Sequence, residues 1–275
     1  MAKTVVTEAE RRRRRPTKQG VVLSEAMIVE TALRMVREHG AAGLSARRLG
    51  IALGADASTV YRYFRGMDEL TLALGDELMR RALAGWRAVG DGWREDLYRL
   101  GLRIHQVYLA HPQAAVLTAS RVSGRANELA ADEAILAALR GAGFPDPAAV
   151  RIYHVFIDQC LAFAALDAAA LVLPAPALES DQRMWRATYA HLAASTHPNL
   201  SATAPLLTER MNDSAYPAAL RMVLDSAEAE LAGAAEAGPA GFAGAAGANG
   251  ANRATAATKA TSSTTESGRP DRRQS

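Results

Sequence analysis

Two short helical patterns joined by a glycine-containing turn occupy residues 44–64, whose sequence is LSARRLGIALGADASTVYRYF. Ser45 is a suitable N-cap for the first helix, and Gly54 breaks that helix. Asp56 or Ala57 then opens the second helix. The arrangement predicts a helix-turn-helix, whose second helix can enter a DNA major groove. The apolar residues spaced to hold these helices together are Leu44, Leu49, Leu53, Val60 and Phe64.

Further helices are expected on both sides of this motif. Ser24 is a suitable N-cap for a preceding helix, and Gly40 stands where a C-terminal glycine is common. Gly66 ends the second helix of the motif, and Asp68 begins a longer helix that runs to about Leu83. We therefore expect a three-helix domain at the N-terminal end of the chain and assign it to residues 21–70.

Polar and aromatic residues on the second helix are the candidate DNA contacts. Small hydroxyls and tyrosines near its outer surface can hydrogen-bond base edges and phosphates, and arginines on the preceding helix can meet the DNA backbone. Each also has a simpler interpretation: the tyrosines as core packing, the hydroxyls as helix caps, and the arginines as solvated charges. The expected DNA-binding residues are Ser45, Arg47, Arg48, Ser58, Thr59, Tyr61, Arg62, Tyr63 and Arg65.

The positive charge of the chain is concentrated at its N-terminal end. Thirteen Lys and Arg against six Asp and Glu give residues 1–66 a formal net charge of +7, whereas the whole chain carries +3. Residues 1–20 include five consecutive arginines at 11–15 and are expected to form a disordered basic arm. The arm can track phosphates or enter a minor groove. Alternatively, it adds only a non-specific, salt-sensitive attraction, which is the reading we favour.

Composition indicates an all-α protein. Apolar residues make up 49% of the chain, with Ala prominent among them, and β-branched residues do not alternate as in strands. The single cysteine, Cys160, excludes an internal disulfide and a cysteine-based zinc site. Neither an uninterrupted apolar run long enough to span a membrane nor a secretory signal is apparent. We therefore expect a cytoplasmic protein with no membrane partner.

Helical patterns continue through the rest of the chain. We expect helices at 93–110, where Pro112 stops the helix, at 127–139 with Asn127 as N-cap, and at 147–172. The helix at 147–172 is apolar almost all round, which indicates burial on more than one side. Helices at 181–194 and 207–231 follow, the last with a possible kink at Pro217. Residues 233–275 are rich in Ala, Gly, Ser and Thr and are expected to be a disordered tail.

The motif also carries a family resemblance. Residues 40–49 follow the pattern G-x-x-G-L-S-x-R-x-L, and residues 52–64 read ALGADASTVYRYF. Together with the preceding helix and the GMDEL start of the next one, they resemble the N-terminal domain of the TetR family of regulators without a gap. Family members usually carry a phosphate-gripping lysine where this chain has Met67, so no phosphate role is assigned to Met67, and Arg65 can take its place.

The resemblance implies more than the residues alone. It implies an all-α homodimer in which residues 71–232 form a helical ligand-binding and dimerisation domain. The helices at 147–172 and 207–231 would form a four-helix bundle with their copies. The symmetry of such a dimer would make the DNA operator a pseudo-palindrome. Most members of the family repress transcription and release DNA when a small molecule rearranges the core.

Candidate effector residues lie in the C-terminal half. Asp158 is an acid within an apolar helix, where a carboxylate is costly unless it is paired or exposed, and this makes it a pocket candidate. Aromatic residues around it can line a pocket, although such residues more often form core. The candidate ligand-binding residues are Tyr108, Tyr153, Phe156, Asp158 and Phe163.

Two other functions are compatible with the same DNA-binding motif. One is a transcriptional activator or a repressor without an effector. The other is a helical enzyme fused to a DNA-binding head. The C-terminal region shows no nucleophile elbow, phosphate loop or paired carboxylates, so we expect no enzymatic activity. No metal or cofactor is expected either, since the four histidines that invite such a role lack ligand spacing; these four are His105, His111, His154 and His191.

Overall fold

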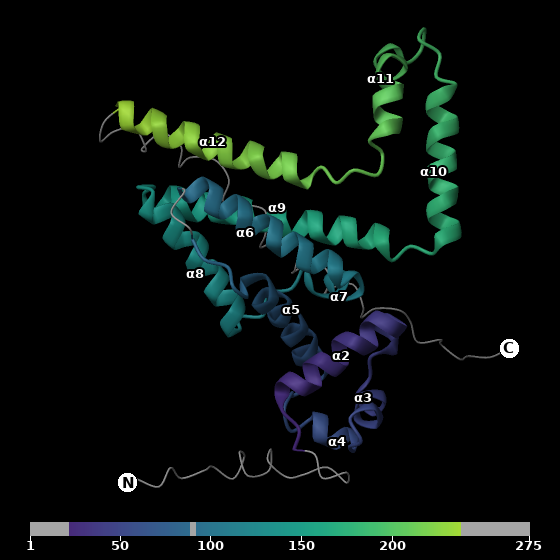
Figure 1. The fold of residues 1–275 in the computed structure, drawn as a ribbon, viewed down its shortest axis with the longest axis vertical. Helices are drawn as coiled ribbons and strands as arrows, with labels where there is room; N and C mark the ends of the chain where they lie inside the picture. The colour runs from purple at the N-terminus through teal and green to yellow at the C-terminus, as the bar shows by residue number, and fades with distance from the viewer. Residues whose placement is uncertain (1–21, 89–91, 238–275) are drawn as a thin grey trace, which may run out of the picture. The chain divides into compact units, whose positions relative to one another are not determined.

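The computed structural model describes residues 22–88 and 92–237, which form α-helices, one 3₁₀ turn and their connections (Figure 1). No strand occurs among these residues, and the predicted all-α class is confirmed. The basic arm at 1–20, including the arginines at 11–15, lies outside the described residues, as does the expected tail from 238 onward.

The N-terminal head contains the helices that the sequence predicts. α2 (Glu25–His39) is capped by Ser24, whose side chain accepts from the Met27 N–H at 3.2 Å, and it ends at Gly40 with φ of 66°. After the short η1 (Ala41–Gly43) come α3 (Ala46–Ala52) and α4 (Ala57–Val60). The buried apolar residues of the head include Ile28, Leu49, Val60 and Phe64.

The central part of the fold consists of five helices. α5 (Met67–Leu83), α6 (Trp93–Ala110), α7 (Pro112–Thr118), α8 (Ala126–Gly141) and α9 (Asp146–Leu171) pack against one another, and α6 runs beside α9 (Figure 1). α6 has the bounds that the sequence predicts. Pro112 also begins α7, which we did not expect, because proline is well suited to the first helical position. The head contacts the central helices at both α5 and α7, within one compact unit that ends at Leu231.

The start of α8 differs from the prediction. Asn127 is not the N-cap, because α8 begins at Ala126. The carboxylate of Asp76, from α5, accepts hydrogen bonds from the Asn127 N–H at 2.9 Å and the Glu128 N–H at 3.1 Å, and it also binds the Asn127 side chain at 2.7 Å. A residue distant in the sequence therefore satisfies the N-terminus of α8.

The C-terminal helices also differ from the prediction. We expected a helix at 181–194, whereas α10 is Ala175–Ala190. The expected helix at 207–231 is two helices, α11 (Pro198–Glu209) and α12 (Tyr216–Ala237). Pro217 does not kink a helix but stands in the first turn of α12, where its missing N–H does no harm. α12 continues to Ala237, so residues 233–237 are helical where we expected a disordered tail.

α9 is the most apolar helix of the fold. Its length and a mean hydropathy of 1.4 over 18 residues would suffice to cross a membrane, although we expected no such segment. Within the described residues, however, α9 packs against α6, α7 and α8. The core helix of a folded domain can be as apolar as a membrane span. The contacts with α6, α7 and α8 bury one side of α9, as expected for such a core helix.

The start of α12 is held against α6 and α9 by a close contact at Gly101. A Cβ atom on Gly101 would lie 2.7 Å from the Tyr216 hydroxyl. That hydroxyl donates to the Cys160 Sγ at 3.1 Å, and the Tyr216 ring stacks on His105 with centroids 4.5 Å apart. Burial raises the pKa of the Cys160 thiol to about 12, so this cysteine stays a neutral packing residue.

Candidate nucleic-acid interface

A tight turn fixes the angle between α3 and α4. The Ala55 N–H donates to the Gly50 carbonyl at 2.8 Å, and Gly54 adopts a φ of 62°, which favours glycine. A Cβ atom on Gly50 would lie 3.0 Å from both the Ala55 oxygen and the Ala57 nitrogen. Glycine at position 50 therefore lets the turn close onto α3. The resulting corner has the helix-turn-helix geometry that the sequence predicts.

The outer face of this corner presents polar groups to solvent. Tyr61 is 53% exposed, and neither its hydroxyl nor the Arg47 guanidinium has a partner among the described residues. Ser58 is also exposed. The carboxylate of Asp56 caps α4 by accepting from the Ser58 N–H at 2.8 Å, so the Ser58 hydroxyl is not the cap. We call Arg47, Ser58 and Tyr61 the open polar surface.

Two of the residues expected on or near the outer surface are more buried than Ser58 and Tyr61. Thr59 is only 7% exposed, because it lies on the inner side of the four-residue α4. Tyr63 is half-buried, and its hydroxyl donates to the Leu23 carbonyl at 2.6 Å. The expectation that these side chains lie outward is therefore wrong for Thr59 and only partly right for Tyr63. The Tyr63 bond instead ties the residues after α4 to the segment that precedes α2.

The remaining candidates differ in exposure and in their contacts. Ser45 caps α3 by accepting from the Arg48 N–H at 3.3 Å, and Arg48 is exposed. Arg62 is half-buried. The Arg65 side chain is held by Glu69, with Nε and Oε2 3.4 Å apart, and the Arg65 N–H lowers the pKa of that carboxyl through a hydrogen bond of 2.6 Å. Arg65 is thus exposed but already paired.

Ile51 of α3 is an exposed apolar residue that was not among the candidates predicted from the sequence. Ile51 is 71% exposed, and it lies beside Arg34 and Arg48 at a shallow cavity of about 310 Å³ between α2 and α3. Its position is out of phase with Leu49, which faces the core. That phase was readable in the sequence and could have identified Ile51 as an exposed residue next to the arginines of α3.

Ion pairs connect the head to the central helices. Arg81 of α5 pairs with Glu30 of α2, and Arg125, just before α8, pairs with Glu25 in the first turn of α2. The Arg125 Nε also lies 3.9 Å from the Asp76 carboxylate that caps α8. These contacts connect α5 and the start of α8 directly to α2, so a displacement of either helix would strain an ion pair with α2.

The predicted effector residues differ in burial and in their contacts. Tyr108 and Phe156 are buried in the core, and burial raises the pKa of Tyr108. Tyr153 is half-buried, and its hydroxyl donates to Asp132 of α8 at 2.8 Å. Phe163 packs against Tyr216 with ring centroids 5.6 Å apart. Asp158 is exposed, which is one of the two ways in which an acid is tolerated on an apolar helix.

The histidines of the central helices take part in ordinary polar contacts. His105 is buried, and its Nε2 lies 2.8 Å from Asp167, which also accepts from the Ser214 hydroxyl at 2.5 Å. Among the described residues, no three His, Cys, Asp or Glu side chains come close enough together to hold a metal ion.

Comparison with known families agrees with this geometry. Residues 28–74 match the family described as "Bacterial regulatory proteins, tetR family", and residues 88–231 match "Tetracyclin repressor-like, C-terminal domain". The second match alone covers more than half of the chain. The chain belongs to the TetR family. This family is one of regulatory proteins, in agreement with the prediction that the chain is not an enzyme.

Individual TetR-like proteins show the same likeness. An "HTH-type transcriptional regulator" of Saccharopolyspora erythraea is 34% identical over 134 residues, which are 47% of this chain and 56% of the relative. The chain thus spans about half the length of the curated relatives that it matches. A crystal structure of a possible TetR family regulator from Streptomyces coelicolor is 30% identical, with a TM-score of 0.63, and covers 75% of this chain and 99% of that one.

A more distant TetR family structure shares the fold. ActR of Streptomyces coelicolor, solved in complex with actinorhodin, is 22% identical to this chain with a TM-score of 0.67. The alignment covers 77% of this chain and 99% of ActR.

Proposed function

We propose that this TetR family protein is a homodimeric transcriptional repressor that binds a palindromic DNA operator and leaves it when a small molecule binds. The observation that carries the proposal is the open polar surface, Arg47, Ser58 and Tyr61, which projects from a helix-turn-helix. Solvated groups that have no partner among the described residues lose little when they exchange water for DNA. The proposal keeps the domain limits 21–70 and 71–232 and a cytoplasmic location.

In DNA recognition, α3 and α4 would make different contacts. α4 enters the major groove and brings the Tyr61 and Ser58 hydroxyls to base edges or to the flanking phosphates. Arg47, on the exposed side of α3, meets the phosphate backbone. Arg48 and Ser45 would support that contact from the same helix. Thr59 and Tyr63 act in this scheme as positioning residues, because their side chains face the head itself.

Dimerisation would use α9 and α12. Both helices carry large apolar side chains that point away from the protomer core, among them Leu166 of α9 and Met222 of α12, which is 72% exposed. Exposed apolar patches on soluble proteins commonly mark interfaces. A two-fold dimer through these helices would place two heads on DNA half-sites of a palindrome.

Release by an effector would act through the contacts between head and core. ActR, which shares this fold, was solved with actinorhodin, and this supports a small-molecule ligand among the C-terminal helices. An effector changes DNA affinity only if it binds the non-operator state more tightly than the operator state. The ion pairs that Glu30 and Glu25 make with Arg81 and Arg125 would carry the change from α5 and α8 to α2.

A selection experiment tests the proposal. The full chain is incubated with random duplexes, the bound sequences are amplified, and the winning site is footprinted. We expect a pseudo-palindrome whose half-sites lie about 10 base pairs, one helical turn, or a multiple apart. A panel of small metabolites should contain a compound that abolishes protection. Enrichment of no sequence would contradict DNA recognition, and an enriched site that no small molecule releases would leave an effector-independent regulator.

A further inference from the structure

α9 presents two separate faces. One face is turned toward the protomer core and includes Phe156 and Cys160, both fully buried. The second face follows the alternating steps of three and four residues of a helix-packing seam and is open in the isolated chain. Its members are Val155, Gln159, Ala162 and Leu166, and all except half-buried Gln159 are exposed.

α12 repeats this division. Tyr216, Leu220 and Leu224 are buried against the core. On the open side the same seam spacing selects residues that are small or apolar and carry no charge: Ala219, Met222, Ser226 and Ala229. The two open faces meet along a groove, and both helices are therefore built to pack on two sides.

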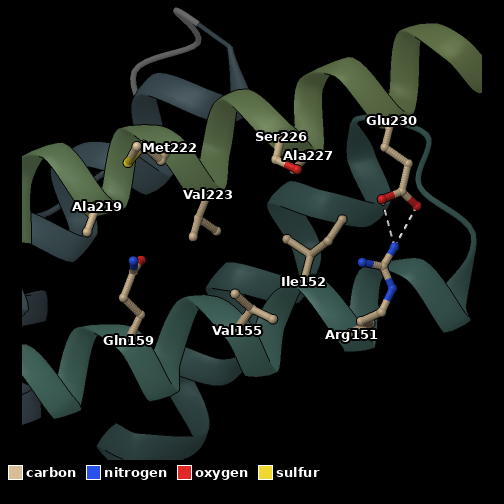
Figure 2. A pocket seen from close by; sticks show the side chains of 10 residues that line it. All are labelled: Arg151, Ile152, Val155, Gln159, Ala219, Met222, Val223, Ser226, Ala227 and Glu230. Atoms are coloured by element: carbon tan, nitrogen blue, oxygen red, sulfur yellow. Dashed lines mark hydrogen bonds and ion pairs between the residues drawn. The ribbon is translucent and has the colours of Figure 1, made fainter. Parts of the chain in front are cut away.

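The groove between α9 and α12 has a volume of about 370 Å³ (Figure 2). Its walls are mainly aliphatic, with Ile152 and Val155 on α9 facing Val223 on α12. An ion pair closes one end, where the Arg151 guanidinium binds both oxygens of Glu230 at 2.6 and 2.7 Å. A partner that fills the groove must be apolar beyond that ion pair.

One polar side chain interrupts the apolar groove. Gln159 reaches from α9 toward α12, with its amide opposite Ala219 (Figure 2). The Gln159 Oε1 atom is buried and accepts no hydrogen bond from any described residue. A buried carbonyl oxygen without a donor is unfavourable, so this site lacks an N–H group.

We propose that a second copy of this chain covers the groove and that the Gln159 amide turns from its buried position toward that copy, where it forms a reciprocal pair with the same amide across the two-fold axis. A primary amide is self-complementary, because it has both a donor and an acceptor, and a two-fold interface brings identical residues together. A single polar residue in an otherwise apolar seam fixes the register and number of the packed helices. The inference rests on the dimer in the proposed function and adds its specificity-determining residue.

Charge variants of Gln159 test whether the residue faces its own copy. Gln159→Glu and Gln159→Lys each place like charges together at the axis, so each variant alone should dimerise at least about tenfold more weakly than wild type. Mixing the two variants should restore dimerisation with the heterodimer in excess, measured by native mass spectrometry with differently sized tags. The matched control is exposed Gln106 on α6, whose Glu and Lys variants should dimerise like wild type.

Gln159→Leu provides an independent check, because an apolar residue suits the groove and preserves folding. We expect tighter self-association with a broader distribution of oligomers, since the register is no longer fixed. If wild type is a dimer but the charge variants also dimerise normally, or show no preference for the heterodimer when mixed, the role of Gln159 is overturned and the dimer stands. A wild-type chain that is monomeric at micromolar concentration would instead overturn the dimer itself.

Discussion

The Nη1 atom of Arg81 lies 2.8 Å from the Nε2 atom of His111, at the junction of α6 and α7. Arginine can only donate, so His111 must accept through a neutral Nε2. The same guanidinium also pairs with Glu30 of α2 and Glu77 of α5. Neutral His111 is thus part of the connection between the head and the central helices.

This contact predicts a pH dependence of stability. Burial, followed by the charge of Arg81, lowers the pKa of His111 below its ordinary value of 6.5, and Arg37 acts in the same direction against Glu30 and Glu77. The unfolded chain then binds the proton more readily than the folded chain. The contribution of neutral His111 to the free energy of unfolding should therefore be fully present above about pH 6.5. It should decrease as the pH drops toward the pKa of the folded state.

His111→Gln isolates this contribution, because the amide oxygen can still accept from Arg81 but does not titrate. Urea unfolding at about pH 7.5 and 5.5, at a fixed protomer concentration, should show a smaller loss of stability in the variant than in wild type. An equal loss in the two proteins would show that His111 does not titrate in this way.

Asp76 predicts a second stability effect. Replacing it with Ala leaves the N-terminal N–H groups of α8 without their acceptor, which should cost about 1–3 kcal/mol. Thermal unfolding should show the loss as a lower Tm. Exposed Asp68, which pairs with Arg121 at 2.8 Å, is the matched control, and its Ala variant should lose less than about 1 kcal/mol. Equal effects at the two positions would argue against the capping role.

Local signals explain why the head could be predicted so closely. Ser24, Ser45 and Gly40 each act on backbone groups within a few residues, so their effect is visible in the sequence. The errors arise where a distant residue decides. Asp76 replaces Asn127 at the start of α8, and the contact between Tyr63 and Leu23 spans 40 residues.

The effector region was less predictable for a related reason. Phe156 and Asp158 lie on one helix, yet the first is fully buried and the second exposed. An apolar helix with two packed faces has no single hydrophobic stripe, so its sequence does not say which side is which. The sequence therefore predicted that α9 is buried on more than one side but did not assign residues such as Gln159 to either face.

The turn between α3 and α4 predicts a sensitive glycine. Gly50→Ala would press a methyl group against the Ala55 oxygen and the Ala57 nitrogen, both 3.0 Å away, and the backbone must shift to admit it. We expect a loss of about 1–3 kcal/mol in stability and weaker operator binding. Gly66→Ala meets nothing within 4 Å and should bind DNA like wild type. Normal DNA binding by Gly50→Ala would mean that the corner is more tolerant than its geometry suggests.

The most direct test of the account is the affinity of the selected operator for wild type, Tyr61→Phe and Arg47→Ala across a range of salt concentrations. Tyr61→Phe should lose about 0.5–1.5 kcal/mol of binding through its missing hydroxyl. Arg47→Ala should weaken binding and reduce the magnitude of the salt slope by about one. Tyr63→Phe, which loses a bond inside the head, is the control and should keep the wild-type salt slope. If Tyr61→Phe and Arg47→Ala bind the operator like wild type at every salt concentration, the open polar surface is not the DNA-binding surface.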